Sequence, residues 1–138
     1  MASSFGPELI RIKEDMDVVR ARAEARRLAG MLGFGPGDQT RLATAVSELS
    51  RNVLLYADHG QCEISDVSTP TDIGIRIVFE DNGPGIADTA LALQDGYSTS
   101  GGLGAGLPGT RRLMDSFAIE SRPGLTRVDI ALKRRRGR

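Results

Sequence analysis

The sequence has little of several residue types that would point to particular kinds of protein. Its 138 residues include one cysteine, Cys62, so no disulfide can form within the chain and a reducing compartment is expected. The one histidine, His59, stands in a polar turn, and no cysteine–histidine cluster offers a transition-metal site. The 18 basic and 18 acidic residues balance, so no overall field favours a nucleic-acid partner.

Long apolar runs are missing as well. No stretch approaches the roughly 20 residues of a membrane span, and the segment Met1–Pro7 does not resemble a signal peptide. We therefore expect a cytoplasmic protein with no membrane partner, folded as a single domain over residues 1–138. The basic run at 133–138 is interpreted as a solvated C-terminal tail, in preference to an arm for nucleic acid or acidic lipid.

Residue spacing predicts three main helices and about five strands. Apolar residues recur every three or four positions from Asp15 or Asp17 to about Leu32, and again from Asp38 to about Tyr56. A third helix is expected over 107–116, with a proline in its first turn, and a short one over 88–94. Alternating apolar residues predict strands at 8–13, 60–65, 73–80, 117–121 and 126–132. These elements favour a two-layer α/β (α+β) sandwich, with a mixed, mostly antiparallel sheet and the three main helices on one face.

The end of the 73–80 strand has the features of a ligand site. Asp81 follows the strand directly, with its carboxylate free to accept a hydrogen bond from a ligand. Asn82–Gly83 and Pro84–Gly85 are turn dipeptides that let the backbone approach a ligand closely. Further on, the glycine-rich segment Gly101–Gly106 precedes the third main helix, whose N-terminus would attract phosphate. A carboxylate that can bind the edge of a base, together with a helix N-terminus that can bind phosphates, predicts a nucleotide-binding site.

Three widespread nucleotide motifs do not fit this chain. Gly104–Gly109 matches GxGxxG, but no predicted strand runs into it and too little chain remains for a doubly wound sheet. A Walker A loop requires Gly-Lys-Ser/Thr, whereas Gly109 is followed by Thr110–Arg111. The His-Arg-Asp and Asp-Phe-Gly triplets of ordinary protein kinases do not occur.

Two polar residues of the second helix are spaced so that they share a face. Glu48 and Asn52 stand four positions apart, one turn above the other, with Arg51 beside them. The spacing by itself leaves two interpretations open. The side chains either face solvent, as such residues usually do, or face a ligand across the helix.

Taken in order, three motifs resemble those of one superfamily. Glu48-xxx-Asn52, Asp81–Gly85 and Gly101–Gly106 resemble the N, G1 and G2 boxes of the Bergerat-type (GHKL) ATPases, which include gyrase, Hsp90, histidine kinases and MutL. The short single-domain length resembles the bacterial anti-sigma factor serine kinases. Within these, the segments most similar to the stressosome switch kinases are Glu48–Asn52, Gly96–Gly109 and Arg112–Asp115. The resemblance covers nearly the whole chain.

The resemblance implies roles for the matching residues. Asn52 would bind Mg²⁺ through its amide oxygen, and Glu48 would be the general base for a substrate hydroxyl. Asp81 would accept a hydrogen bond from the adenine amino group, with the backbone at Gly83 and Gly85 passing close to the base. The ATP-binding lid over the phosphates would consist of Gly101, Gly102, Leu103, Gly104, Ala105 and Gly106. Phosphate charge would be neutralised by Arg51, Arg111 or Arg112, although Arg51 could equally pair with an acidic residue of a partner.

The resemblance also implies an activity. The chain would be an ATP- and Mg²⁺-dependent protein serine/threonine kinase that phosphorylates STAS-domain scaffold or antagonist proteins of a stressosome-type complex. Once released, it would bind and activate a PP2C-type phosphatase in a sigma-factor stress cascade. One alternative is an anti-sigma factor that sequesters a sigma factor and phosphorylates its antagonist. Another is a pure binding module in which ATP is structural.

Overall fold

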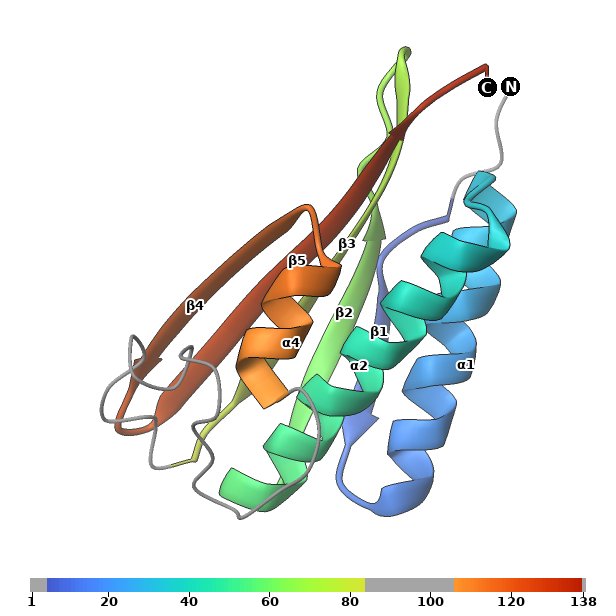
Figure 1. Ribbon diagram of the computed structural model, residues 1–138. Helices are drawn as coiled ribbons and strands as arrows, with labels where there is room; N and C mark the ends of the chain where they lie inside the picture. The colour runs from blue at the N-terminus through green and yellow to red at the C-terminus, as the bar shows by residue number, and fades with distance from the viewer. Residues whose placement is uncertain (1–4, 84–105, 138) are drawn as a thin grey trace.

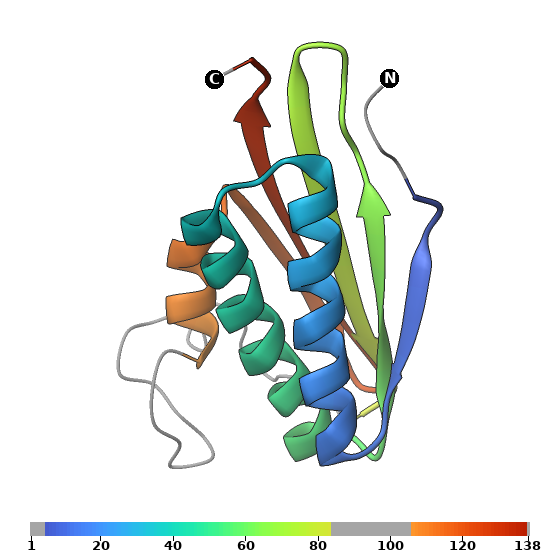
Figure 2. The ribbon, with the colours of Figure 1, turned by 90° about the vertical axis from the view of Figure 1, so that its right-hand side faces the viewer.

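The computed structural model describes residues 5–83 and 106–137, which form a five-stranded sheet with helices on one face (Figures 1 and 2). The strand order is β1-β2-β3-β5-β4, and each neighbouring pair is antiparallel. The prediction of a two-layer sandwich is confirmed. The sheet is mostly antiparallel, as predicted, and in this part of the chain every neighbouring pair is antiparallel: β2–β3 and β4–β5 are hairpins, and β5 inserts beside β3. The strands are β1 (Glu8–Ile12), β2 (Gly60–Asp66), β3 (Asp72–Asp81), β4 (Ser116–Arg122) and β5 (Leu125–Arg135), and the helices are α1 (Asp15–Leu32), α2 (Pro36–Tyr56) and α4 (Gly106–Leu113).

The sheet has a buried face and an open face because side chains alternate along each strand. Strand β3 buries Ile75, Ile77 and Phe79 against the helices. Its other face carries Arg76, which forms a two-pronged ion pair with Asp129 of β5. An antiparallel sheet can leave such a charged face in water, so the core lies between the sheet and the helix layer.

Helix α1 begins and ends with specific backbone contacts. The Asp17 carboxylate accepts hydrogen bonds from the backbone N–H groups of Lys13 and Glu14, at 2.9 and 3.1 Å. These bonds lower the pKa of Asp17, because they favour its charged form. At the other end Gly33 adopts a φ of 103°, a left-handed conformation that favours glycine, and stops the helix.

Helix α2 begins at Pro36, two residues before the start at Asp38 that its sequence predicts. Proline fits the first helical position, because that residue needs no N–H partner and its φ is already helical. Gly35 takes the capping position with an extended backbone. Asp38 therefore lies inside the first turn, where a negative charge is favourable and where its side chain can reach other elements.

The interpretation of residues 133–138 as a solvated tail is wrong for most of the segment. Lys133, Arg134 and Arg135 belong to β5 and pair with β3 as far as Asp72. Beyond the strand, the Arg136 backbone N–H still bonds to the carbonyl oxygen of Thr71 in the β2–β3 turn. Side chains continue to alternate between the two faces of the sheet to the end of β5, so β5 stays paired with β3 although its last residues are basic. Within residues 5–83 and 106–137, no helix is long and apolar enough to cross a membrane.

Candidate functional site

The carboxylate of Asp81 lies where β3 meets the helix layer. Alternation from Ile77 and Phe79 turns Asp81 toward the helices, and the side chain is half-buried. Burial raises the pKa of Asp81 above its ordinary value, while a hydrogen bond from the Gly83 backbone N–H at 3.0 Å acts in the opposite direction. Within the described residues only one of its oxygens accepts a hydrogen bond, and such a partly desolvated carboxylate is suited to accept another from a ligand.

Gly83 is held in place on three sides. Its N–H donates to Asp81, and its carbonyl oxygen accepts from the Gly124 N–H at 2.9 Å. A Cβ at this position would collide with the carbonyl oxygen of Tyr56 and would lie 3.0 Å from the Cβ of Ala57. The turn after β3 is therefore packed directly against the end of α2, and only glycine fits there without displacing the backbone.

The hydroxyl of Thr126 lies opposite Asp81, and the sequence patterns do not predict this position. Thr126 of β5 is the direct antiparallel partner of Asp81, so the two side chains share the helix-facing side of the sheet. The Thr126 hydroxyl is 2.8 Å from that of Ser121 on β4. The signal that could have found it is the pairing register of β5 with β3, which no local pattern in residues 126–132 reveals.

Helix α2 has α1 on one side and α4 on the other (Figures 1 and 2). The α1 side is marked by a hydrogen bond from Arg26 to Thr40 and by Gln39, whose Nε2 would lie 3.4 Å from a Cβ placed on Gly30. Asp38 marks the other side, because Arg134 links it to Asp115 at the end of α4. A stripe at intervals of three and four residues runs along this side: Asp38, Arg41, Ala45, Glu48 and Asn52.

Glu48 and Asn52 therefore face the α4 side of α2, and both are half-buried. Glu48 forms an ion pair with Arg51 at 3.5 Å, in which Glu48 is 24% exposed and Arg51 54%. The next residue along, Val53, lies on one side of Gly60, and Asp81 lies near the same glycine. A Cβ placed on Gly60 would lie 2.8 Å from Val53 Cγ1 and 3.0 Å from Asp81 Cβ. The polar stripe and the Asp81 carboxylate thus converge on the same end of the helix layer.

The remaining predicted site residues lie mostly outside the described part of the chain. Gly85 and residues 101–105 belong to the segment 84–105, as does the helix expected over 88–94. Gly106 is the first residue of α4, which ends at Leu113, three residues before the predicted end. The roles proposed for these residues stay predictions.

The family follows from a comparison with known proteins. Residues 37–136 match the HATPase_c family model, described as "Histidine kinase-, DNA gyrase B-, and HSP90-like ATPase". The chain belongs to this family. The serine/threonine-protein kinase RsbT of Bacillus subtilis (strain 168) is 51% identical over 115 residues, which is 83% of this chain and 86% of RsbT. The chain is thus an RsbT-like serine/threonine kinase of the HATPase_c family, and the predicted resemblance is confirmed.

Solved structures share the HATPase_c fold at low sequence identity. A Mycobacterium tuberculosis structure of RsbU and RsbW domains is 14% identical with a TM-score of 0.65, covering 94% of this chain and 33% of that one. The chain therefore spans about a third of the mycobacterial protein. The catalytic domain of histidine kinase ThkA, nucleotide-free, gives a TM-score of 0.54 at 14% identity, covering 91% of this chain and 95% of that domain. Identities this low establish a common fold only.

The donor set of the HATPase_c chain fits Mg²⁺ bound together with ATP. Among the described residues, no group of three His, Cys, Asp or Glu side chains is placed to hold a metal ion. A cation held mainly by phosphate oxygens and water needs few protein ligands, and an amide oxygen such as that of Asn52 suits it. Glu48 lies on the same stripe. The residues present are compatible with a magnesium ion that arrives with its nucleotide.

A hollow of about 390 Å³ adjoins the turn after β3 in this HATPase_c chain. The described residues that line it are Tyr56, Ala57, Asp58, His59, Asn82 and Gly83. Asp81, Glu48 and Asn52 are not among them. Among the described residues, the hollow is therefore bounded by the end of α2 and the turn after β3.

Proposed function

We propose that the chain transfers the γ-phosphoryl group of ATP to a serine or threonine of a STAS-domain protein. On this proposal it then binds and activates a PP2C-type phosphatase. The observation that carries the proposal is the convergence of the Glu48–Asn52 stripe with the half-buried Asp81 carboxylate. The 51% identity to the serine/threonine-protein kinase RsbT supports transfer to serine or threonine, and the STAS-domain class is what the resemblance of the sequence implies.

In the proposed reaction Glu48 accepts the proton of the substrate hydroxyl. The hydroxyl oxygen forms a bond to the γ-phosphorus while the bond from that phosphorus to the β–γ bridging oxygen breaks, and ADP leaves. Arg51 lies 3.5 Å from the Glu48 carboxylate and orients it for this role. Bound Mg²⁺ would neutralise charge on the phosphates, with Asn52 as its protein ligand.

The same proposal assigns recognition of the base to Asp81 and binding of the phosphates to the start of α4. The second carboxylate oxygen of Asp81 accepts from the adenine amino group, which guanine lacks at that position. The fixed backbone of Gly83 forms the wall beside it. The proposed lid, residues 101–106, leads into α4, whose first N–H groups face the phosphates.

The test uses the purified chain, Mg²⁺ and γ-labelled ATP with a STAS-domain scaffold protein. We expect label on serine or threonine of the scaffold, and a loss of about 100- to 10,000-fold for Glu48→Gln, which cannot accept the proton. Glu63→Gln on the exposed face of β2 is the matched control and should retain activity. Absence of phosphoserine and phosphothreonine, in conditions where the two proteins bind, would remove the kinase assignment for this substrate. A pull-down that returned a sigma factor instead would favour the anti-sigma alternative.

A further inference from the structure

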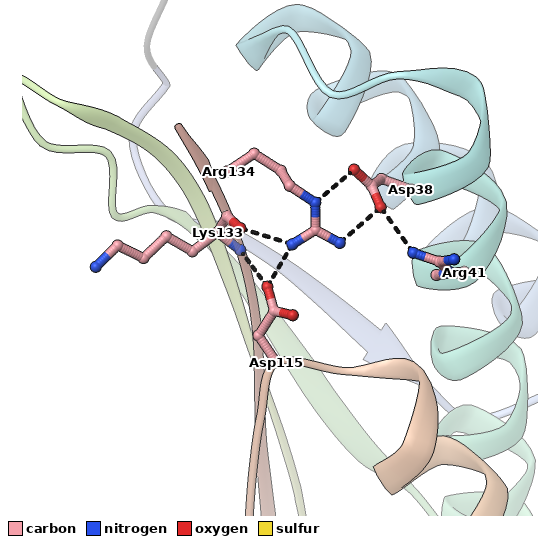
Figure 3. A network of polar contacts seen from close by, with 5 residues as sticks. All are labelled: Asp38, Arg41, Asp115, Lys133 and Arg134. Atoms are coloured by element: carbon pink, nitrogen blue, oxygen red, sulfur yellow. Dashed lines mark hydrogen bonds and ion pairs between the residues drawn. The ribbon is translucent and has the colours of Figure 1, made fainter. Parts of the chain in front are cut away.

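One arginine joins the two helices that flank the proposed phosphate site (Figure 3). The Arg134 guanidinium donates two hydrogen bonds to the Asp38 carboxylate, from Nε to Oδ2 at 2.9 Å and from Nη2 to Oδ1 at 2.8 Å. Its remaining nitrogen, Nη1, donates to Asp115 Oδ2 at 2.6 Å. Arg134 comes from β5, Asp38 from the first turn of α2, and Asp115 follows the end of α4.

Each carboxylate of this cluster has further support. Asp115 also accepts from the Lys133 backbone N–H at 2.8 Å, and its own N–H donates to the Ala131 carbonyl oxygen at 3.1 Å. Asp38 is 3.3 Å from Arg41 on its own helix. The end of α4 is thus fixed to β5. The side chain of Arg134 fixes the start of α2 to β5 and to the end of α4.

The side chain of Arg134 is 35% exposed, that of Asp38 15% and that of Asp115 45%. Burial would lower the pKa of Arg134, but hydrogen bonds to the two carboxylates raise it overall, so the guanidinium stays charged. The planar fork of arginine can hold two carboxylates at fixed angles, which the single ammonium group of lysine cannot reproduce.

The two helices joined by this cluster carry the proposed chemistry. Asp38 begins the stripe of α2 that leads to Glu48 and Asn52, and α4 begins at Gly106, where its first N–H groups would face the phosphates in the proposed function. A small shift of α4 against α2 would therefore change the distance between the phosphate end of the nucleotide and Glu48. Reaction rates are sensitive to such displacements, and about 1 Å can change a rate 100-fold.

We propose that Arg134 is a positioning residue for phosphoryl transfer, which sets α4 against α2 by holding Asp38 and Asp115 together. The inference rests on the proposed kinase function. It assigns Arg134 no contact with ATP or with the substrate protein. Its effect is on the turnover step, because the purine contacts at Asp81 lie at the other end of β3 from Arg134.

The experiment compares Arg134→Met with a matched control, Arg76→Met, in the full chain. Arg76 forms the same kind of two-pronged pair between β3 and β5, with Asp129, but on the open face of the sheet. We expect Arg134→Met to lower kcat for phosphotransfer by about 10- to 100-fold at saturating ATP. ATP affinity should stay within about threefold of the wild type, and Arg76→Met should leave both quantities unchanged.

A second readout does not depend on nucleotide. In the nucleotide-free protein, amide hydrogen exchange in α4 (Gly106–Leu113) should be faster in Arg134→Met than in the wild type and in Arg76→Met. Adding Asp38→Asn to Arg134→Met should lower kcat no further, because the two residues act as a unit. Arg134→Lys should rescue only part of the loss, and it replaces Arg134→Met in each measurement if that variant does not fold.

The outcomes separate this inference from the proposed function. A wild-type chain that transfers no phosphate to a STAS protein contradicts the proposed function itself. An active wild type with unchanged kcat and unchanged α4 exchange in Arg134→Met contradicts only the positioning role. Equal losses of kcat in Arg134→Met and Arg76→Met, measured well below both unfolding temperatures, would likewise overturn it, since they would reflect general destabilisation.

Discussion

Replacing Asp81 by Asn should weaken ATP binding while leaving the nucleotide-free protein at least as stable. The substitution keeps the size of the side chain. Its carbonyl oxygen can still accept from the Gly83 N–H, which lies 3.0 Å from Asp81 Oδ1. The amide nitrogen then takes the place of the other carboxylate oxygen, so a donor faces the adenine amino group, which is also a donor.

The expected loss of affinity follows from that mismatch. Leaving a buried hydrogen-bonding group without its partner costs about 1–3 kcal/mol, which corresponds to a rise in the ATP Kd of about 5- to 150-fold. The expected effect on folding is favourable: Asp81→Asn should raise the free energy of unfolding of the nucleotide-free protein. Burial raises the pKa of Asp81, so the folded state favours the protonated form and ionisation of Asp81 opposes folding at neutral pH. A neutral amide removes this penalty.

The pH dependence gives a further check. Because the pKa of Asp81 is raised in the folded state, its favourable contribution is fully present below the unfolded pKa and is lost as the pH rises through the folded pKa. The stability difference between Asp81→Asn and the wild type should therefore be largest at neutral pH. It should shrink as the pH falls through the carboxyl range toward about 4.

The assays are ATP titration by calorimetry and urea unfolding followed by circular dichroism, since the chain has no tryptophan. Asp66→Asn is the matched control, because Asp66 ends β2 and accepts from the Ser68 N–H at 2.9 Å in the same i to i+2 arrangement. The control should bind ATP normally. An Asp81→Asn variant that binds ATP within twofold of the wild type, or a control that loses as much affinity, would refute the reasoning.

Two further predictions concern the packing around the site. Gly83→Ala should destabilise the protein by about 1–3 kcal/mol in urea unfolding, because the new methyl group collides with the Tyr56 carbonyl oxygen. Gly37→Ala, where no atom lies within 4 Å, should be neutral or stabilising, and equal effects of the two would contradict the steric account. Burial raises the pKa of the Cys62 thiol to about 12, so we expect no reaction with a disulfide reagent at pH 8 until urea unfolds the chain. Rapid stoichiometric labelling of the native protein would show that β2 is not buried as described.

The parts of the fold that could be predicted depend on local spacing. Apolar residues at intervals of three and four predict α1 from Asp15 to Leu32, and alternation predicts the strands to within one to three residues at each end. The start of α2 was misplaced because Asp38 is a good capping residue. Proline at the first helical position, after a glycine, was the better signal.

The missed features depend on contacts between distant segments. The charge of the basic run predicts a solvated tail, yet Arg134 continues the alternation of Ile130 and Leu132 and faces the helices. Following the alternation past Leu132 would have placed it. Thr126 could not be found in this way, since its position opposite Asp81 depends on how β5 inserts beside β3.

The order of the strands has a consequence for biosynthesis. Among the described strands β5 emerges from the ribosome last, yet it pairs with β3 in the middle of the sheet. Until then the nascent chain exposes an unpaired β3 edge that other polypeptides can engage, and neither Thr126 nor the Gly124 bond to Gly83 is in place. A newly made molecule should therefore pass through a stage in which the surroundings of Asp81 are incomplete, and should gain ATP affinity in one late step.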